Sequence, residues 1–209
     1  KVLKYVYEKF GHSSLQTHGY LLDDKFIEIF KKYNTSVGVS IDGFPEMNAY
    51  RVVPHFDDQS EVTKQIMRNL KKLKKEDINV SVISILHNKN GLPKQREKLK
   101  EWILWLKDIG ITGGRLNLAL DNGFNRDIAL TPEQGRDVWK DLFHFTMVEH
   151  EGLSWKPFQD IPKNLLGIRQ GTCIFTQCLY YHAHTESVIL SDAKSVNCLK
   201  PAIKEGHMY

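Results

Sequence analysis

The strongest constraint on the fold of this chain is a regular alternation between short apolar segments and longer amphipathic ones. Residues 36–41 read SVGVSI and residues 78–86 read INVSVISIL, two β-branched runs that predict buried strands. Between these runs, apolar side chains recur at helical spacing, at Val62, Ile66, Leu70 and Leu73. Such alternation predicts an α/β fold with parallel strands and crossover helices. A (β/α) barrel and an open doubly wound sheet fit the pattern equally well.

The same periodicity continues on both sides of these runs. Further strands are expected at residues 13–17 and 116–120, and further helices at residues 1–10, 23–33, 99–109 and 131–150. From Trp155 onward the pattern gives way to short elements and turns. We therefore expect two units, residues 1–160 and residues 161–209.

Charge and hydropathy narrow the classes of partner. The chain has 29 Lys and Arg residues against 25 Asp and Glu residues, and this net charge of +4 is too small to indicate nucleic acid. No apolar run reaches the length of a membrane span, and no signal peptide opens the chain. We expect a cytoplasmic protein with no membrane partner. Because the first residue is Lys1 rather than Met, the chain is expected to begin in mid-protein or after processing.

All three cysteines lie near the end of the chain, in the pattern Cys173-x4-Cys178-x19-Cys198. An odd number of thiols without a secretion signal argues against a disulfide framework. Thiolates bind soft metals, so the cluster indicates an iron–sulfur or a zinc site. His182, His184 or a group outside the chain would complete it. Three incidental thiols are the alternative.

Small polar residues stand where two predicted strands end. Gln16 and Thr17 precede Gly19, and Ser40 and Asp42 close the strand at residues 36–41. In parallel α/β folds, ligands bind at the carboxyl ends of the strands. These four residues are therefore candidate ligand contacts, and capping of turns by Ser and Asp is the competing interpretation.

Two motifs give the chain a resemblance to a known family. The segment QTHG, followed by Leu21-Leu22, precedes GVSIDG at residues 38–43 by about two dozen residues. This pair resembles the radical S-adenosylmethionine (SAM) enzymes of the peptide- and protein-modifying branch, such as the sulfatase-maturating enzymes. The chain differs from their usual motif at His18, where Asn is usual, and at Tyr20, where Thr is usual. The resemblance covers most of residues 10–125.

The resemblance implies a role for each strand-end residue. Gln16 and Thr17 match the strand beside the adenosyl and methionine moieties of SAM, and Ser40 matches a residue near the methionine end. Asp42 is expected to orient its loop. Arg51 stands where the family places an Arg, and it is expected to pair with the SAM carboxylate, which suits its bidentate geometry.

The tail resembles the SPASM or twitch domains that bind auxiliary [4Fe-4S] clusters. Those domains place two cysteines four residues apart before a short hairpin and an Asn-Cys pair. Here Cys173 and Cys178 are followed by residues 191–193 and by Cys198. Ala193 replaces the expected turn glycine. The resemblance implies that the three cysteines are ligands of one auxiliary cluster.

The family's defining motif, Cys-x3-Cys-x2-Cys, does not occur in the sequence. In the family, this motif holds a [4Fe-4S] cluster that takes an electron from an external donor and cleaves SAM reductively. The resulting radical abstracts hydrogen from a peptide or protein substrate. The resemblance therefore implies a partial (β/α) radical SAM barrel with a small cysteine-bearing auxiliary domain, truncated at its N-terminus and inactive alone. A catalytically inactive binding module and an α/β protein with a structural zinc site are the alternatives.

Overall fold

The computed structural model describes residues 1–119, 121, 125–168, 188–189 and 195–196. The chain divides into two compact units, Lys1–Gln159 and Asp160–Tyr209, and each is described by itself. The prediction that residues 161–209 form an auxiliary cluster domain depends on three cysteines, and all three lie outside the described residues. It therefore stays a prediction.

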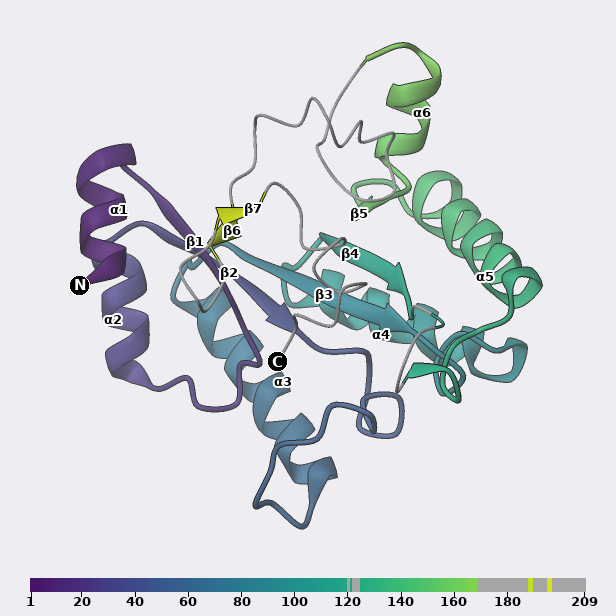
Figure 1. The fold of residues 1–209 in the computed structure, drawn as a ribbon, viewed down its shortest axis with the longest axis horizontal. Helices are drawn as coiled ribbons and strands as arrows, with labels where there is room; N and C mark the ends of the chain where they lie inside the picture. The colour runs from purple at the N-terminus through teal and green to yellow at the C-terminus, as the bar shows by residue number, and fades with distance from the viewer. Residues whose placement is uncertain (120, 122–124, 169–187, 190–194, 197–209) are drawn as a thin grey trace. The chain divides into compact units, whose positions relative to one another are not determined.

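The first unit alternates strands and helices from end to end (Figure 1). Its strands are β1 (Ser13–Thr17), β2 (Thr35–Ser40), β3 (Val80–Leu86), β4 (Gly113–Leu118) and β5 (Ser154–Lys156). Its helices are α1 (Val2–Phe10), α2 (Asp24–Lys32), α3 (Gln59–Lys75), α4 (Arg96–Asp108) and α5 (Pro132–His144), with a 3-10 turn at Pro93–Gln95 and a π turn at Phe145–Glu149. The predicted α/β fold is confirmed.

The strands form one parallel five-stranded sheet in the order β1-β2-β3-β4-β5. Because crossovers between parallel strands are right-handed, an order that follows the chain places the connecting helices on one face of the sheet. Figure 1 shows α3 and α4 on the far side of the strands. This single winding is that of a (β/α) barrel, whereas a doubly wound sheet reverses its strand order and covers both faces. Among the described residues β1 and β5 are the edges of the sheet.

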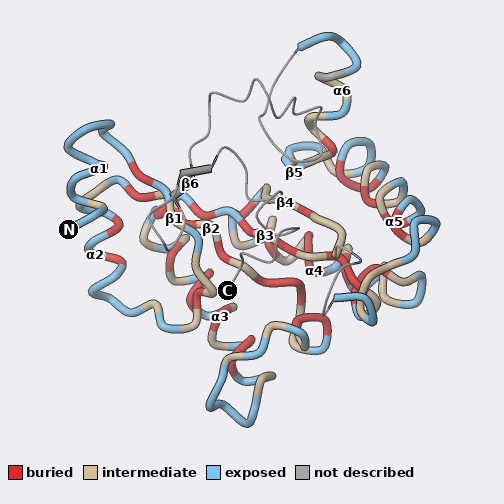
Figure 2. Tube along the Cα trace, in the orientation of Figure 1, coloured by how far each residue is buried: buried red, intermediate tan, exposed pale blue. Residues whose placement is uncertain are grey.

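The side of the sheet that faces the helices holds the hydrophobic core. Side chains of β2 and β3 alternate between buried and partly exposed, with Val37, Val39, Val82 and Leu86 at 1% exposure or less. They pack against the apolar stripes of α3 and α4, which were predicted from helical spacing. In Figure 2 the buried segments run through the strands, whereas α1 and the outer side of α5 are exposed.

Local signals explain the helix boundaries. Asp58 caps α3, because its Oδ1 accepts hydrogen bonds from the backbone N–H groups of Ser60 and Glu61 at 2.9 and 3.1 Å. Thr131 and Gln134 form a capping box at the start of α5. The α-helical part of α5 ends at His144, and the π turn carries the chain almost to the predicted end at residue 150.

Most strand boundaries differ from the prediction by one to three residues: β2 is Thr35–Ser40 where 36–41 was expected, β3 starts at Val80 where 78 was expected, and β4 ends at Leu118 where 120 was expected. β4 begins at Gly113, three residues before the expected start. Gly113 and Gly114 show no apolar alternation, but they let the backbones of β5 and β3 pair with β4 where a Cβ would not fit. β5 was not predicted. It is three residues long, and Trp155 is its single buried side chain, so it shows too little alternation to be recognised.

The described part of the second unit holds α6 (Asp160–Leu165) and an antiparallel pair, β6 (Val188–Ile189) and β7 (Ser195–Val196). Across the described residues of the whole chain, no helix combines the length and the apolar character that a membrane span requires.

Candidate functional site

The loop after β1 is held by side chains from two elements. The Thr17 hydroxyl accepts a hydrogen bond from the Gly19 N–H at 3.1 Å. Asn69 of α3 donates its amide to the carbonyls of Gly19 and Tyr20, at 2.8 and 3.0 Å. Gly19 has a φ of +82°, and a Cβ there would lie 2.8 Å from a methyl group of Val39. Thr17 therefore caps the turn after β1, although the competing interpretation from the sequence assigned turn capping to Ser and Asp residues.

Asp42 lies at the centre of a polar network where β2 ends. Its side chain is 3% exposed, and its Oδ1 accepts hydrogen bonds from the Ile85 backbone N–H at 2.7 Å and from Arg51 Nη2 at 2.8 Å. The other oxygen, Oδ2, lies 3.7 Å from His87 Nε2. Arg51, predicted to pair with a SAM carboxylate, thus forms an ion pair with a carboxylate of the protein itself.

Two buried asparagines fix the backbone around this carboxylate. Asn48 accepts a hydrogen bond from the Asp42 N–H at 2.8 Å and donates one to the Thr63 hydroxyl at 3.0 Å. Asn90 donates to the Asp42 carbonyl at 3.0 Å and accepts from the His87 N–H at 2.8 Å. These hydrogen bonds fasten the loop after β2 to α3 and to the end of β3.

Gly43, directly after Asp42, has no room for a side chain. Its φ is +145°, and a Cβ at this position would lie 2.5 Å from the terminal methyl of buried Met47. A glycine is therefore required for the chain to turn away from the sheet immediately after the carboxylate.

Several buried polar atoms at this edge of the sheet have no hydrogen-bond partner among the described residues. They are both ring nitrogens of His18, Nε of Arg51, Nε2 of His87 and Oδ1 of Asn117. Each buried polar group without a partner costs about 1–3 kcal/mol. These four residues come from the ends of β1 to β4 or from the loops that follow these strands. Together they offer hydrogen-bond donors and acceptors that suit a polar ligand.

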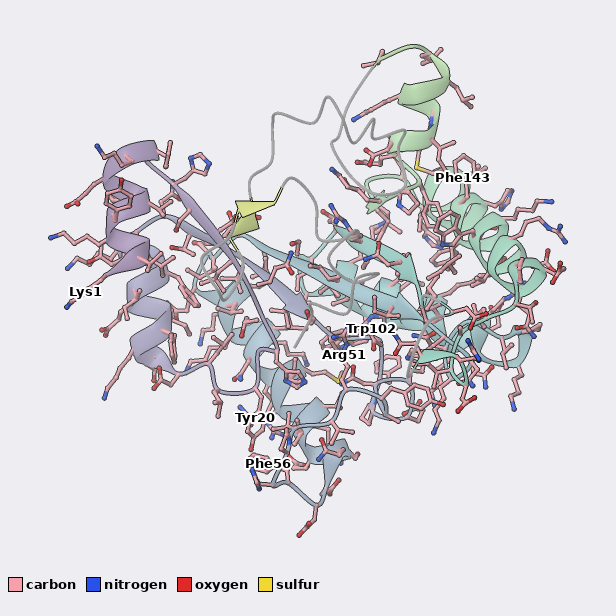
Figure 3. All side chains as sticks on the ribbon, viewed as in Figure 1. Lys1, Tyr20, Arg51, Phe56, Trp102 and Phe143 are labelled. Atoms are coloured by element: carbon pink, nitrogen blue, oxygen red, sulfur yellow. The ribbon has the colours of Figure 1, made fainter. Side chains whose placement is uncertain are left out.

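His18 is electrostatically coupled to this set. Burial lowers the pKa of its imidazole, and the nearby Arg51 guanidinium lowers the pKa further, whereas Asp42 acts in the opposite direction. The imidazole is therefore neutral at pH 7 and can both donate and accept a hydrogen bond. Figure 3 shows Arg51 beside the strand ends, with Tyr20 and Phe56 farther out in the loops, where their rings meet at a centroid distance of 4.8 Å.

The structure divides the residues that the sequence singled out. Gln16 and Ser40 lie on the face of the sheet away from the helices. Along β2, Gly38 and Ser40 alternate with the valines that are buried on the helix side, and Gln16 is in register with Gly38. Thr17 points to the helix side, in register with buried Val39. Asp42 and Arg51 come together as an ion pair at the strand ends.

Sequence reasoning missed His87, Asn90, Asn48 and Asn117 as part of the site. A signal existed for two of them, because His87 follows β3 directly and Asn117 lies near the end of β4. The rule that selected Ser40 and Asp42 as strand-end residues therefore also applies to them. Asn48 and Asn90 lie within loops, and no sequence pattern marks them.

The described residues fit SAM and do not fit an iron–sulfur cluster. The unpartnered Arg51 Nε–H suits a carboxylate, and the neutral His18 ring and the Asn117 oxygen suit amino and hydroxyl groups. The described residues contain no group of three His, Cys, Asp or Glu side chains that could hold a metal ion. The predicted cluster ligands Cys173, Cys178 and Cys198 lie outside them.

Comparison with known proteins gives a likeness in structure. No family model matches the chain, and neither does any curated protein. The structure described as "Native anSMEcpe with bound AdoMet and Kp18Cys peptide" aligns at 18% identity with a TM-score of 0.67, over 88% of this chain and 50% of that chain. The structure described as "Native anSMEcpe with bound AdoMet" aligns at 18% identity with a TM-score of 0.63, over 77% of this chain and 44% of that chain.

The chain thus spans about half the length of the solved chains that it matches. At this level of identity the likeness is one of fold, and the parallel sheet with its helices is consistent with part of a radical SAM fold.

Proposed function

We propose that this chain forms the SAM-binding part of a radical SAM enzyme that acts on a peptide or protein. The observation that carries the proposal is the set of unpartnered buried polar atoms on His18, Arg51, His87 and Asn117 at the carboxyl edge of the sheet. The same edge carries the two motifs that resemble the family. The shared fold with anSMEcpe, a sulfatase-maturating radical SAM enzyme whose structures hold AdoMet and peptides, supports the same assignment.

In this proposal the amino-acid end of SAM lies against Arg51. Its guanidinium uses Nη2 for Asp42 and keeps Nε–H for the ligand carboxylate. Asp42 holds the guanidinium in place, and the Ile85 N–H holds Asp42. Ser40 and Gln16 line the open face beside the ligand, and the neutral His18 ring supplies a hydrogen bond without adding charge next to Arg51.

SAM, when reduced by a [4Fe-4S] cluster, supplies the radical that abstracts hydrogen from a substrate. The described residues hold SAM and do not ligate that cluster, so the cluster and its external electron donor come from outside them. The part of the reaction assigned to these residues is to bind the cofactor, to orient it and to exclude water from its amino-acid end.

The test is a binding measurement that uses three nucleosides. Isothermal titration compares SAM, S-adenosylhomocysteine and methylthioadenosine, which lacks the amino-acid end, on the chain and on Arg51→Lys. Loss of one charge-assisted contact weakens binding by roughly tenfold to a hundredfold. We expect that loss for SAM and S-adenosylhomocysteine and no change for methylthioadenosine. Exposed Arg136→Lys is the matched control, and equal losses for all three nucleosides would contradict the proposed orientation.

For the tail we propose an auxiliary iron–sulfur cluster held by Cys173, Cys178 and Cys198, with a structural zinc site as the alternative. Anaerobic reconstitution with iron and sulfide, followed by metal counting and visible absorption, distinguishes them. Iron with a charge-transfer absorption that is lost in Cys173→Ala supports the cluster. Colourless protein that retains zinc supports the alternative.

A second candidate function is a SAM-binding module without radical chemistry. It is favoured by one observation, the absence of a Cys-x3-Cys-x2-Cys run from the sequence. Release of 5′-deoxyadenosine after reconstitution and reduction distinguishes the two. The chain is a binding module if it binds SAM tightly but releases no 5′-deoxyadenosine under these conditions, even when the cysteine motif is supplied on a preceding segment.

A further inference from the structure

The imidazole of His87 is held firmly in place, and one of its ring nitrogens is left over. The backbone N–H of His87 donates a hydrogen bond to Asn90 Oδ1 at 2.8 Å, and its Nδ1 accepts one from the Lys89 N–H at 3.2 Å. The ring of Tyr50 packs edge-on against the imidazole at a centroid distance of 4.9 Å. The His87 side chain is 1% exposed, and its Nε2 has no hydrogen-bond partner among the described residues.

The contact at Nδ1 determines where the ring proton lies. A backbone N–H can only donate, so Nδ1 of His87 accepts the hydrogen bond from Lys89 and carries no proton itself. The ring is therefore in its uncharged form, with its proton on Nε2. A buried N–H group without an acceptor destabilises a protein, so we expect this one to meet an acceptor when the site is in use.

The carboxylate of Asp42 is the acceptor that Nε2 faces. Nε2 of His87 lies 3.7 Å from Asp42 Oδ2, and the Asp42 side chain is 3% exposed. The hydrogen bonds from the Ile85 N–H and from Arg51 both go to Oδ1, so Oδ2 is the oxygen on the His87 side. An approach of less than about 1 Å would complete a hydrogen bond. Polar contacts at binding sites commonly shorten in this way when a ligand engages them.

Asp42 connects His87 to Arg51. Nη2 of Arg51 donates to the Asp42 carboxylate at 2.8 Å, while Arg51 Nε has no partner among the described residues. Tyr50, the residue before Arg51, packs on His87, so consecutive residues contact the imidazole and the carboxylate. An uncharged donor on Oδ2 can hold the carboxylate without bringing a second positive charge next to the guanidinium.

On the basis of the proposed function, we infer that His87 is a positioning residue for SAM. Its Nε2–H holds Oδ2 of Asp42, so that the carboxylate is fixed at both oxygens and the Arg51 guanidinium is aimed at the carboxylate of the ligand. Among the residues with unpartnered atoms at this edge of the sheet, His87 thus acts on the ligand through Asp42 and Arg51, and not by direct contact.

The test uses two substitutions that each keep one half of the imidazole. His87→Asn keeps an acceptor near the position of Nδ1 but does not reach Asp42, whereas His87→Gln places an amide N–H near the position of Nε2. Isothermal titration measures SAM and methylthioadenosine on both variants. We expect His87→Asn to bind SAM about tenfold more weakly and His87→Gln to stay within about twofold of the unsubstituted chain. Neither variant should change the affinity for methylthioadenosine, which lacks the amino-acid end.

A double-mutant cycle separates action through Arg51 from direct contact with the ligand. In the Arg51→Gln background, His87→Asn should cause no further loss of SAM affinity, because the guanidinium that it positions is gone. Losses that multiply would assign His87 a contact of its own with SAM and overturn the inference. Equal losses for SAM and methylthioadenosine would indicate a merely structural role and also overturn it. The matched control is His12→Asn at an exposed histidine, which should leave both affinities unchanged.

The tautomer of His87 provides a second measurement, which needs no variant and no ligand. Nitrogen-15 NMR of the histidine rings should show the proton of His87 on Nε2 and none on Nδ1. The opposite tautomer overturns the inference even if the variants fail to fold, which melting curves establish. The two proposals fail in different ways. SAM binding that is equal in His87→Asn and in the unsubstituted chain rejects the inference alone, whereas an unsubstituted chain that does not bind SAM rejects the proposed function and the inference with it.

Discussion

The two faces of the sheet differ in what their residues do, although both are built from the same strands. On the helix side, Val39, Val82 and Leu86 are nearly or completely buried and make only apolar contacts that hold the fold together. On the other side, Ser40, Arg115 and Lys156 belong to a row that also holds Ile83, and none of these side chains is buried. The difference indicates that residues that hold the core together alternate along each strand with residues that are open to a solvent or a ligand, so that one set can be altered without the other.

The largest expected effect separates the two faces on a single strand. Leu86→Ala removes a fully buried side chain of β3 and should lower the free energy of unfolding by about 2–5 kcal/mol. Ile83→Ala, on the open face of the same strand, should cost less than half as much because Ile83 is only partly buried. Chemical denaturation measures both. Equal losses would mean that the open face is packed as tightly as the helix face.

The second prediction tests the polar network at the strand ends. Asp42→Ala leaves the Ile85 N–H and the Arg51 guanidinium without their acceptor, and should lower the free energy of unfolding by about 3 kcal/mol. The control is Asp24→Ala, which removes an exposed ion pair with Lys72 and should cost less than about 1 kcal/mol. If the two substitutions had equal effects, Asp42 would not be the centre of a buried network.

The third prediction concerns the turn that carries Asp42. Gly43→Ala places a Cβ against Met47 at a φ of +145°, and should destabilise the protein by about 1–3 kcal/mol while weakening SAM binding. Gly152→Ala provides the comparison, because Gly152 has a φ of +86° but no atom within 4 Å of the added Cβ. Thermal melting should show the smaller loss at Gly152, and SAM affinity should be unchanged there.

Some parts of this structure could be predicted from the sequence because they depend on local spacing. The strands of residues 36–41 and 78–86 and the stripe on α3 follow from periods of two and of 3.6 residues, and the structure confirms them to within a few residues. β5 was missed because a three-residue strand shows a single alternation. Its existence depends on β4 being present as a neighbour.

The candidate site was predictable only in outline. Strand ends could be located, so Gln16, Ser40 and Asp42 were selected without knowledge of the fold. The choice of partner could not be predicted, because Arg51 meets Asp42 through the turn at Gly43, and His87 approaches from another strand. Sequence order gives the ends of strands, whereas the pairing of charges at those ends is decided by tertiary packing.

The smallest expected effect is a dependence of stability on pH that originates from His18. Its pKa in the folded protein lies below the ordinary value of 6.5, chiefly because of burial and then because of Arg51. The unfolded chain therefore binds a proton at a higher pH than the folded chain. Between the two pKa values the free energy of unfolding falls as the pH falls, and above about pH 6.5 this group contributes no slope.

His18→Asn, which introduces the residue usual in the similar family, should remove that slope, and denaturation curves collected in steps from pH 7 to pH 5 should detect it. Arg51→Gln should narrow the pH window from its lower end, because it removes a charge that lowers the pKa of His18. A slope that persists in His18→Asn would assign it to another group. A slope that extends to lower pH when SAM is added to the unsubstituted chain would place the His18 ring against the ligand, because a ligand that hydrogen-bonds the neutral ring lowers the pKa of His18 further in the folded state alone.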